Sequence, residues 1–397
     1  MATDTLETKV NYLTKRENNG RWFLSHPDWS WIEGWFETKK ELSYRMKSKK
    51  VKKIFVICPF PEGEAAGQRL KYEQFFDHWR KNGYEIEVSS FMDERMWSIV
   101  YTQGNYFQKV FGTIKGYFRR IRDIFRLRNF DLVYVFMWVT PFGSSFFERL
   151  FVRLSHKLIY DIEDNALILQ SNNLNPVIKL FKGAGKIEFL IKSANHVITS
   201  SPFLNKDCLK LNQQKSCTFI SDAIDIRRYC PNNKYSNNKT VVIGWTGTFS
   251  SAIYLDLLKN VFFELNKRID FKLRIIGNFE YSIPGIDLEV IQWSKETEIE
   301  DLQGIDIGIY PLTQDKWVLG KSGLKAIQYM ALGLPTIATN VGTNPSIISH
   351  MENGLLVKTE QEWILALQNL IEMPDLRAKI GAKARNTIEE NYSTEVM

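Results

Sequence analysis

The stretch that decides the fold covers residues 321–339 and reads KSGLKAIQYMALGLPTIAT. It opens with small and basic residues, continues as an apolar segment that we predict to be helical, stops at Gly333 and runs into an apolar strand. The first backbone N–H groups of a helix have no partner within the helix, and the helix dipole is positive at that end. Because Lys321 and Lys325 add positive charge there, we expect an anionic ligand at the start of this helix.

This stretch resembles the C-terminal signature of the retaining glycosyltransferases of family 4 and their relatives. The resemblance continues in NVGTNP at 340–345 and ENGLLV at 352–357. It covers nearly all of residues 51–397 and is strongest at 240–357. It implies the α/β architecture called GT-B, in which two doubly wound Rossmann-like domains face a central cleft and ligands bind beyond the carboxyl ends of the strands. It also implies that the helix start holds a nucleotide-sugar.

Strands and helices alternate from Lys53 onward, which is typical of parallel sheets covered by helices. In the first half, we predict a helix over 68–83 and strands at 53–59, 85–89, 131–137, 157–162, 196–200 and 218–221. In the second half, we predict strands at 241–245, 271–276, 288–291, 306–310 and 336–339. The helices predicted there are 252–266, 296–303, 323–332, 360–371 and 375–390.

The chain therefore divides into five predicted parts. They are an N-terminal extension (1–50), an acceptor domain (51–226), a polar, Asn-rich linker (227–240), a donor domain (241–380) and a C-terminal helix that returns to the first domain (381–397). The extension is rich in Trp and has no clear period. It either packs on the first domain or makes an interfacial membrane contact, to which Trp is suited. Alternatively, Met46 is the natural start.

The net charge of +7 is unevenly distributed along the chain. Residues 1–225 hold 34 of the 52 Lys and Arg and 25 of the 45 Asp and Glu, which leaves them at +9 and the rest of the chain at −2. This asymmetry indicates that the first half binds an anionic surface, either a membrane or a nucleic acid. We expect a membrane surface and no nucleic acid.

Several classes of protein and site are disfavoured by what the sequence lacks. No apolar run approaches the roughly 18 residues of a membrane span, and no secretory signal opens the chain. The four cysteines form no C-x-x-C pair and the five histidines show no metal spacing, so we expect reduced thiols and no metal. Neither a Gly-x-Ser-x-Gly elbow nor a Walker A loop occurs, which argues against hydrolases and kinases. We expect a cytoplasmic protein, with a peripheral position on the inner face of the membrane as the alternative.

The donor domain opens with GWTGTFSS at 244–251. A strand that runs into small residues lets the backbone approach a diphosphate, so we expect Thr246, Gly247 and Thr248 to contact the donor. In the family an arginine usually stands where this chain has Thr248, and a lysine follows it. We therefore predict that Lys321 and Lys325, four apart and on one helical face, replace that clamp. The alternative is a solvated surface pair.

The helix start itself, Ser322, Gly323 and Leu324, is expected to complete the donor site. The family commonly has two glutamates seven residues apart, one for the donor sugar and one for the ribose. Alignment places Gly320 at the first position and Gln328 at the second. The Gln328 amide can still bind a ribose hydroxyl; the alternative is a polar residue lodged in a helix interface.

The first domain supplies two further candidate regions. The resemblance places Gly67 near the donor phosphates and Arg69 in the cleft. In YDIED at 160–164, Asp161 takes the place of a family His-Asp pair near the transferred sugar or acceptor. Its carboxylate could orient or deprotonate an acceptor hydroxyl. Metal binding and helix N-capping are the alternatives.

Residues 106–128 combine two patterns. Apolar residues fall at helical spacing, and seven Lys and Arg accompany them against the single acidic residue Asp123. Such a helix can lie on an anionic membrane. Alternatively, the apolar stripe is buried on the domain sheet and the basic face is solvated; both could hold, with the cationic face towards lipid headgroups.

The sequence thus predicts a hexosyltransferase-like glycosyltransferase that moves a sugar from a nucleotide-sugar, its co-substrate, to a glycan or lipid-linked acceptor in cell-surface polysaccharide synthesis. We expect no cofactor. The resemblance implies front-face attack with retention, while Lys321 and Lys325 stabilise the leaving diphosphate. The alternatives are a GT-B sugar-nucleotide epimerase and a non-catalytic nucleotide-sugar-binding subunit.

Overall fold

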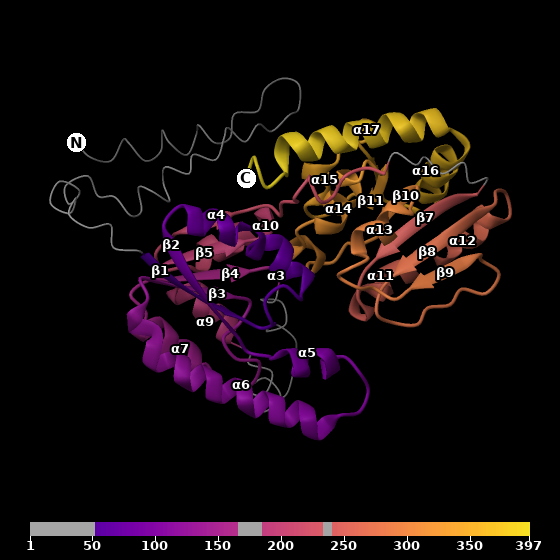
Figure 1. The fold of residues 1–397 in the computed structure, drawn as a ribbon. Helices are drawn as coiled ribbons and strands as arrows, with labels where there is room; N and C mark the ends of the chain where they lie inside the picture. Colours follow the sequence, from indigo (N-terminus) through magenta and orange to yellow (C-terminus); the bar gives the residue numbers. More distant parts are fainter. Residues whose placement is uncertain (1–51, 166–184, 233–239) are drawn as a thin grey trace, which may run out of the picture. The chain divides into compact units, whose positions relative to one another are not determined.

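The structure is a computed structural model that describes residues 52–165, 185–232 and 240–397 (Figure 1). The predicted N-terminal extension and residues 233–239 of the predicted linker lie outside the described residues. Residues 52–396 form one compact unit.

The first half of this unit contains a six-stranded parallel sheet with the order β2-β1-β3-β4-β5-β6. Its strands are β1 (Lys52–Cys58), β2 (Tyr84–Ser90), β3 (Leu132–Phe136), β4 (Leu158–Ile162), β5 (His196–Thr199) and β6 (Cys217–Phe219). Side chains of β1 alternate between two cores. Phe55 and Ile57 belong to one, whereas Ile54 and Val56 belong to the other. A strand buried on both faces in this way carries helices on both sides, as doubly wound sheets do.

The second half contains a second six-stranded parallel sheet with the order β12-β11-β10-β7-β8-β9. Its strands are β7 (Val241–Thr246), β8 (Phe271–Ile276), β9 (Leu288–Ile291), β10 (Ile307–Tyr310), β11 (Thr336–Thr339) and β12 (Leu355–Val357). The strand predictions match both sheets within about two residues, except that β12 was not predicted. With three residues, β12 is too short to show a period.

The helices of the first half are α3 (Ala66–Lys71), α4 (Phe76–Lys81), α5 (Glu94–Val100), α6 (Tyr106–Arg126), α7 (Phe146–Leu154), α9 (Lys186–Ser193) and α10 (Pro202–Leu211). The single helix predicted over 68–83 is therefore wrong. It is interrupted by the 3-10 turn η3 (Glu73–Phe75), because Tyr72 leaves helical geometry and packs its ring between Phe76, Tyr134 and Phe136.

The helices of the second half are α11 (Ala252–Asp256), α12 (Lys259–Asn266), α13 (Glu298–Gln303), α14 (Leu324–Ala331), α15 (Asn344–Ile347), α16 (Glu360–Glu372) and α17 (Pro374–Asn391). The 3-10 turns are η4 (Leu127–Asn129), η6 (Phe249–Ser251) and η7 (Val318–Gly320). The helix predicted over 252–266 is split between α11 and α12. After α17 the chain meets the first half again, where Thr394 N donates to Ile224 O at 3.0 Å.

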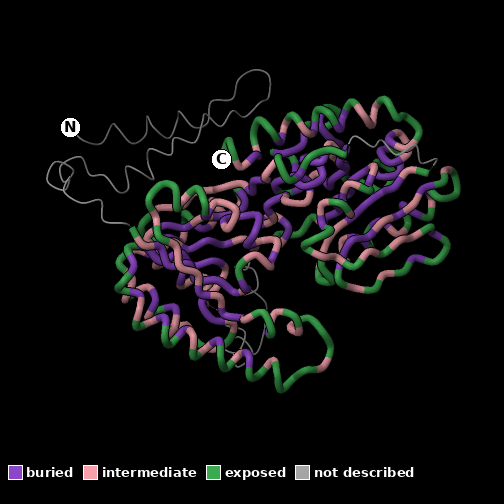
Figure 2. The backbone as a smooth tube through the Cα atoms, viewed as in Figure 1, coloured by how far each residue is buried: buried purple, intermediate pink, exposed green. Residues whose placement is uncertain are grey.

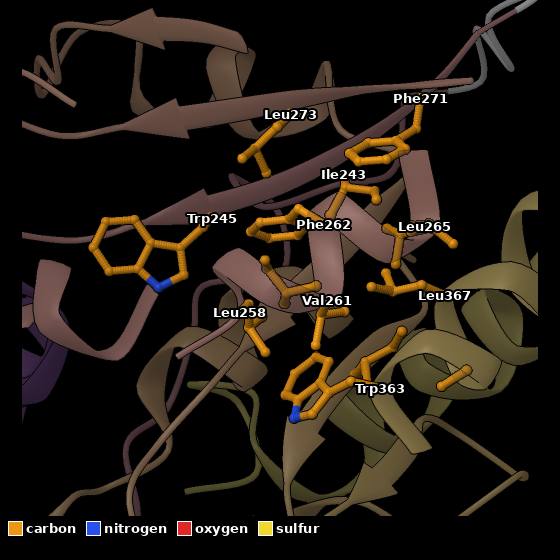
Figure 3. Close-up of a cluster of buried hydrophobic side chains, with 14 of the residues drawn as sticks. Ile243, Trp245, Leu258, Val261, Phe262, Leu265, Phe271, Leu273, Trp363 and Leu367 are labelled. Atoms are coloured by element: carbon orange, nitrogen blue, oxygen red, sulfur yellow. The ribbon is translucent and has the colours of Figure 1, made fainter. Parts of the chain in front are cut away.

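One core of the second sheet is rich in aromatic side chains (Figure 3). Trp245 of β7, Phe262 of α12 and Trp363 of α16 belong to this cluster. The ring of Phe271 of β8 lies 6.1 Å from that of Phe262, centroid to centroid. Fully burying such a side chain stabilises the fold by roughly 1.5–3 kcal/mol. This packing holds β7 rigidly, and β7 leads into the loop at 247–251.

Helix α6 turns its apolar stripe away from the protein, as the exposed positions along it show in Figure 2. Phe107, Phe118 and Phe125 are exposed, whereas the residues that pack inward include Gly112 and Arg120. The predicted alternative that buries the stripe on the sheet is therefore wrong. The helix is held instead by its small and polar face.

Candidate functional site

A cavity of about 170 Å³ lies beyond the carboxyl ends of strands from both sheets. Its lining comes from the segment after β4 and from β10, the loop after β7, and the start of α14. The lining residues are Glu163, Asp164, Ser251, Tyr254, Tyr310, Leu312, Lys321, Ser322, Leu324 and Lys325. Doubly wound sheets place ligands at this edge. The cavity is hereafter called the cleft pocket.

The start of α14 lies at the cleft pocket, whose lining includes Ser322, Leu324 and Lys325. Gly323 occupies the N-cap position with φ +86° and has no side chain to cap the helix, and the Leu324 N–H donates to Ser322 Oγ at 3.4 Å. A Cβ at Gly323 would stand 2.4 Å from Ile347 Cδ1, so both the left-handed backbone and the space require glycine. The predicted helix start is present in the structure; its role in binding an anion stays a prediction.

The prediction that Lys321 and Lys325 share one helical face is wrong. Helix α14 begins at Leu324, and Lys321 is extended, because the left-handed turn at Gly323 separates it from the helix. Both side chains nevertheless line the cleft pocket. The turn at Gly323, and not a spacing of four residues along one helix, therefore brings the two lysine side chains to the same cavity.

Lys325 is partly buried among aromatic rings. Its Nζ lies 4.6 Å from the centroid of the Trp245 ring, 5.6 Å from that of Tyr310 and 3.5 Å from Ser251 Oγ. Burial and the neighbouring charge of Lys321 lower the pKa of Lys325 to about 7, against a partial opposing effect of Asp164. The ring faces stabilise the charged form. The amine is therefore poised to gain a proton when an anion arrives.

Lys321 faces the acidic side of the cleft pocket. Its Nζ lies 3.7 Å from Asp164 Oδ1 and 5.7 Å from the centroid of the Tyr254 ring. The side chains of Lys321 and Asp164 are 22% and 39% exposed, so water screens this pair and it holds the lysine only weakly. An incoming phosphate could replace Asp164 as its partner.

Two neighbouring carboxyl groups of the YDIED segment have different surroundings. The Asp161 side chain is 1% exposed, pairs with Lys71 Nζ at 2.6 Å and accepts a hydrogen bond from Tyr134 Oη. Glu163 instead lines the cleft pocket. Burial, only partly opposed by Lys71, raises the pKa of Glu163 to about 8. The structure thus places Asp161 in a buried ion pair, and Glu163 and Asp164 in the cavity.

Lys71 is the buried cation of this acidic cluster. Burial by itself would lower its pKa, but the charges of Asp161, Glu163 and Asp222 outweigh that effect and raise it. Lys71 was not predicted as a site residue, because a lysine inside an amphipathic helix ordinarily indicates a solvent-exposed position. Gly67, on the same helix, packs against Glu163, whose Oε2 would lie 2.8 Å from a Cβ there.

Steric crowding explains why position 320 is a glycine. A Cβ there would lie 2.4 Å from the backbone N of Asn165, which follows the acidic segment. Asn165 Nδ2 donates to Lys316 O at 3.0 Å, and Ser200 Oγ donates to Gly320 O at 3.1 Å. The segment that carries Glu163 and Asp164 thus occupies the space in which a side chain at 320 would lie.

Arg69 and Gln328 belong to a buried polar network outside the lining of the cleft pocket. Arg69 Nη2 pairs with Glu298 Oε2 at 2.6 Å, and Gln328 Nε2 donates to Glu298 Oε1 and to Tyr229 Oη, each at 3.3 Å. Arg69 Nε and Nη1 have no hydrogen-bond partner among the described residues. The ribose contact of Gln328 and the cleft role of Arg69 stay predictions.

The backbone N–H groups of residues 246–248 already donate within the protein. Thr246 N donates to Tyr329 Oη at 2.9 Å, Gly247 N to Ile276 O at 3.0 Å and Thr248 N to Ser251 Oγ at 3.0 Å. A phosphate could be bound there only by exchanging these hydrogen bonds. The start of α14 is the better-placed backbone donor.

A larger and more open hollow of about 630 Å³ lies beyond β8 and β9. It is lined by Asn278, Phe279, Glu280, Tyr281, Ser282, Val290 and Gln292. It holds no lysine or arginine, so we place the ionic chemistry in the cleft pocket despite its smaller volume. Across the described part of the chain, no His, Cys, Asp and Glu cluster fits a metal ion. None of the helices described there is long and apolar enough to cross a membrane.

Six lining residues of the cleft pocket were not among the predicted site residues: Glu163, Asp164, Ser251, Tyr254, Tyr310 and Leu312. Glu163 and Asp164 belong to the YDIED segment, of which only Asp161 was predicted as a site residue. Tyr310 ends a predicted strand, and Glu163 and Asp164 follow another. The position of these residues at strand ends was therefore the available signal.

The second half of the chain is similar to known glycosyltransferases. Residues 231–387 match the family model described as "Glycosyl transferases group 1". Over 76 residues the chain is 42% identical to the D-inositol 3-phosphate glycosyltransferase of Rhodococcus jostii, a match that covers 18% of this chain and 16% of that protein. The matches span about a third or less of the length of the curated relatives.

Two solved structures show the fold of the whole unit. The sucrose-phosphate synthase of Thermosynechococcus elongatus superposes with a TM-score of 0.64 at 13% identity, covering 87% of this chain and 96% of that one. The Anabaena protein Alr3699/HepE, solved in complex with UDP and glucose, superposes with a TM-score of 0.58 at 12% identity, covering 86% and 96%. The predicted GT-B fold is confirmed.

Proposed function

We propose that this protein is a glycosyltransferase that transfers a sugar from a nucleotide-sugar to a hydroxyl of a glycan or lipid-linked acceptor, with retention, in cell-surface polysaccharide synthesis. The observation that carries the proposal is the cleft pocket. It joins an uncapped helix start to Lys321 and Lys325 within a segment that matches group 1 glycosyl transferases. The structural neighbour solved with UDP and glucose supports a nucleotide-sugar as the donor.

The donor diphosphate would lie at the start of α14. There the backbone N–H groups and the two lysines would stabilise the negative charge that grows on the phosphate as the glycosidic bond breaks. Ligand pockets commonly measure roughly 300–1,000 Å³, so a cavity of about 170 Å³ suits the diphosphate and part of the sugar only. The base would lie outside it.

Glu163 would bind the sugar or phosphate side of the donor as a neutral carboxylic acid. Its raised pKa keeps a proton on the carboxyl group near neutral pH, so the group can donate a hydrogen bond without repelling phosphate. Asn165, which follows Glu163 and Asp164, occupies the region that Gly320 leaves free. We therefore propose that this segment supplies the carboxyl group that position 320 lacks.

Asp161 would act by holding Lys71, because its carboxylate is buried and already paired. The resemblance implies that the acceptor hydroxyl attacks the front face of the donor sugar, with no enzyme nucleophile. In that case the acceptor proton passes to the departing phosphate oxygen, and no buried carboxylate is needed as a base.

Thermal-shift measurements with UDP-, GDP- and dTDP-sugars test the donor class directly, because a ligand that binds only the folded state raises the melting temperature. We expect one nucleotide series to stabilise the wild-type protein and Lys325→Gln to lose most of that shift. The absence of a shift with every nucleotide-sugar would contradict the proposal. Binding without transfer to any acceptor would favour the non-catalytic alternative, and conversion of the free donor would favour an epimerase.

A further inference from the structure

Helix α6 exposes an unusually large set of apolar side chains. Phe107 is 93% exposed, Phe125 81% and Phe118 67%. The other exposed apolar residues of the helix are Tyr106, Val110, Phe111, Ile114 and Ile121. Monomeric soluble proteins rarely leave so continuous an apolar row in water. We therefore expect this apolar row to be covered by a binding partner.

The exposed residues share one face of the helix. At about 100° per residue, the seven apolar residues from Phe107 to Phe125 fall within an arc of about 100°. The buried residues Gly112, Gly116, Arg120 and Asp123 lie on the opposite side. The helix is 21 residues long, which corresponds to about 31 Å at 1.5 Å per residue. The result is one straight apolar row and not a scatter of exposed side chains.

The rotation of α6 is set by its inner face. A Cβ at Gly116 would stand 2.5 Å from the Phe91 ring, so the helix backbone lies directly on that ring. Arg120 is fully buried and donates to Val139 O and Cys58 O, each at 2.8 Å, and to Asp123 Oδ2 at 3.0 Å. A rotation of α6 about its axis that buried its phenylalanines would break these hydrogen bonds and leave the buried Arg120 guanidinium without partners. Exposure of the apolar face is therefore built into the fold.

Cations border the apolar row on one flank. Lys115, Arg119, Arg122 and Arg126 fall at about 60–120° from the centre of the row by the same helical geometry. Arg119 and Arg126 are held by protein partners, the carbonyl oxygens of Ser90 and Phe91 and the carboxylate of Glu87. The Lys115 and Arg122 side chains remain 52% and 64% exposed. Lys115 Nζ lies 3.8 Å from Asp93 Oδ2, and Arg122 Nη2 lies 3.7 Å from Asp123 Oδ1. Because such long pairs of solvent-exposed cations are weak, both cations can exchange them for anionic groups at the level of the helix.

We propose that α6 is a membrane-insertion surface, in which the phenylalanine row enters the acyl boundary of an anionic bilayer while Lys115 and Arg122 meet the lipid headgroups. An amphipathic helix with an apolar face and a cationic flank suits that interface. A lipid surface fits better than a second protein, because a single straight row with a one-sided cationic border matches a plane of anionic headgroups above an apolar layer. The inference goes beyond the proposed transfer reaction and does not depend on it.

Insertion predicts a salt response different from that of a purely ionic contact. The Debye length falls from about 10 Å at 0.1 M salt to about 3 Å at 1 M, so headgroup attraction is screened while apolar burial is not. We expect the full chain to co-sediment with vesicles of three parts phosphatidylcholine to one part phosphatidylglycerol. In 1 M NaCl, vesicle partitioning should fall about threefold to tenfold and should not disappear, because the apolar contribution is not screened.

Paired variants separate the two contributions. Phe118→Ser with Phe125→Ser should lower vesicle partitioning at least tenfold at both salt concentrations. Lys115→Gln with Arg122→Gln should lower it about threefold to tenfold at 0.1 M salt, with little further effect at 1 M. Leu365→Ser, at a 56% exposed position of α16, is the matched control and should bind like the wild type. All four side chains lie largely in water, so the melting temperatures should stay within a few degrees.

Three results would overturn the proposal. The wild type fails to sediment with these vesicles at 0.1 M salt, or its binding disappears entirely at 1 M, or the phenylalanine variant binds as well as the wild type. Sedimentation velocity without lipid completes the test. A dimer that dissociates in the phenylalanine variant would show that the face joins two copies of the chain instead.

Discussion

Lys325 shows how a single partly buried residue can connect ligand charge to pH. Trp245 and Tyr310 enclose its ammonium group, Lys321 repels it, and its pKa falls to about 7. A diphosphate beside it would raise that pKa, because a nearby negative charge favours the protonated form. Donor binding above pH 7 would then take up a proton.

We therefore expect donor affinity to fall as the pH rises from 7 to 9, by up to about tenfold per pH unit for each linked proton. Titration calorimetry at pH 8, in buffers of different ionisation enthalpy, measures the proton uptake. Lys325→Arg keeps its charge throughout this range and should show a flatter pH profile. The same pH dependence in the wild type and in Lys325→Arg would exclude Lys325 as the titrating group.

Asp161 and Glu163 stand two residues apart and should respond differently to amide substitution. Asp161→Asn leaves Lys71 without its closest partner, and breaking a buried ion pair costs roughly 3–5 kcal/mol of folding stability. Glu163→Gln resembles the protonated acid and should retain the fold and much of the donor binding near pH 7. Chemical denaturation and donor titration of both variants distinguish the roles. An Asp161→Asn protein of unchanged stability and donor affinity but reduced transfer would instead support the predicted acceptor role.

The helix start of α14 and the turn η7 before it form the element on which the proposed site depends. Gly323 sets the left-handed turn into the helix, and Gly320 lies against the backbone of Asn165. Ser201 Oγ adds a hydrogen bond to Leu319 O at 2.8 Å. The segment after β4 and the segment before α14 therefore form one joined structure. A substitution in either segment should therefore change the geometry of the cleft pocket.

Restoring the glutamate that the family commonly carries, through Gly320→Glu, should reduce donor binding and not improve it. The new Cβ would collide with Asn165 N at 2.4 Å and displace the segment that carries Glu163. We expect at least a tenfold loss of donor affinity by calorimetry, with Leu365→Ser as a surface control. Equal or tighter binding would show that the cleft pocket can accept a side chain at position 320.

Across the whole unit, the buried network of Arg69, Glu298, Gln328 and Tyr229 joins residues of the two halves. Arg69 and Glu298 are 229 positions apart in sequence, and their side chains are only 8% and 6% exposed. Removing one partner of such a pair leaves an uncompensated buried charge, whereas removing both does not. This difference separates the pair from ordinary surface salt bridges.

Arg69→Met alone should cost roughly 3–5 kcal/mol of unfolding free energy, and the Arg69→Met, Glu298→Met double variant should recover a large part of it. Denaturant melts of the wild type, both single variants and the double variant complete the cycle. Lys53→Met with Glu85→Met provides the control, because that pair is 45% and 58% exposed and should change stability by at most about 1 kcal/mol. Additive losses for Arg69 and Glu298 would show that the two charges are not coupled.

Local pattern alone was sufficient for much of the fold. Apolar runs separated by helical segments predicted both parallel sheets, and the small and basic residues before Ala326 predicted the uncapped helix start. These features depend on neighbouring residues, which sequence displays directly. The short strand β12 and the break at Tyr72 escaped prediction, since the first shows no period and the second depends on an aromatic cluster assembled from distant strands.

Tertiary structure alone decided which polar groups reach the cleft pocket and which way α6 faces. Asp161 and Glu163 look equivalent in sequence, yet Lys71 from another element neutralises the first and leaves the second in the cavity. An apolar helical stripe ordinarily predicts burial. In α6 the hydrogen bonds of Arg120 and the close packing of Gly116 on Phe91 turn it outward. The cost of leaving a buried charge unpaired is set by residues far apart in the chain, and no local pattern records it.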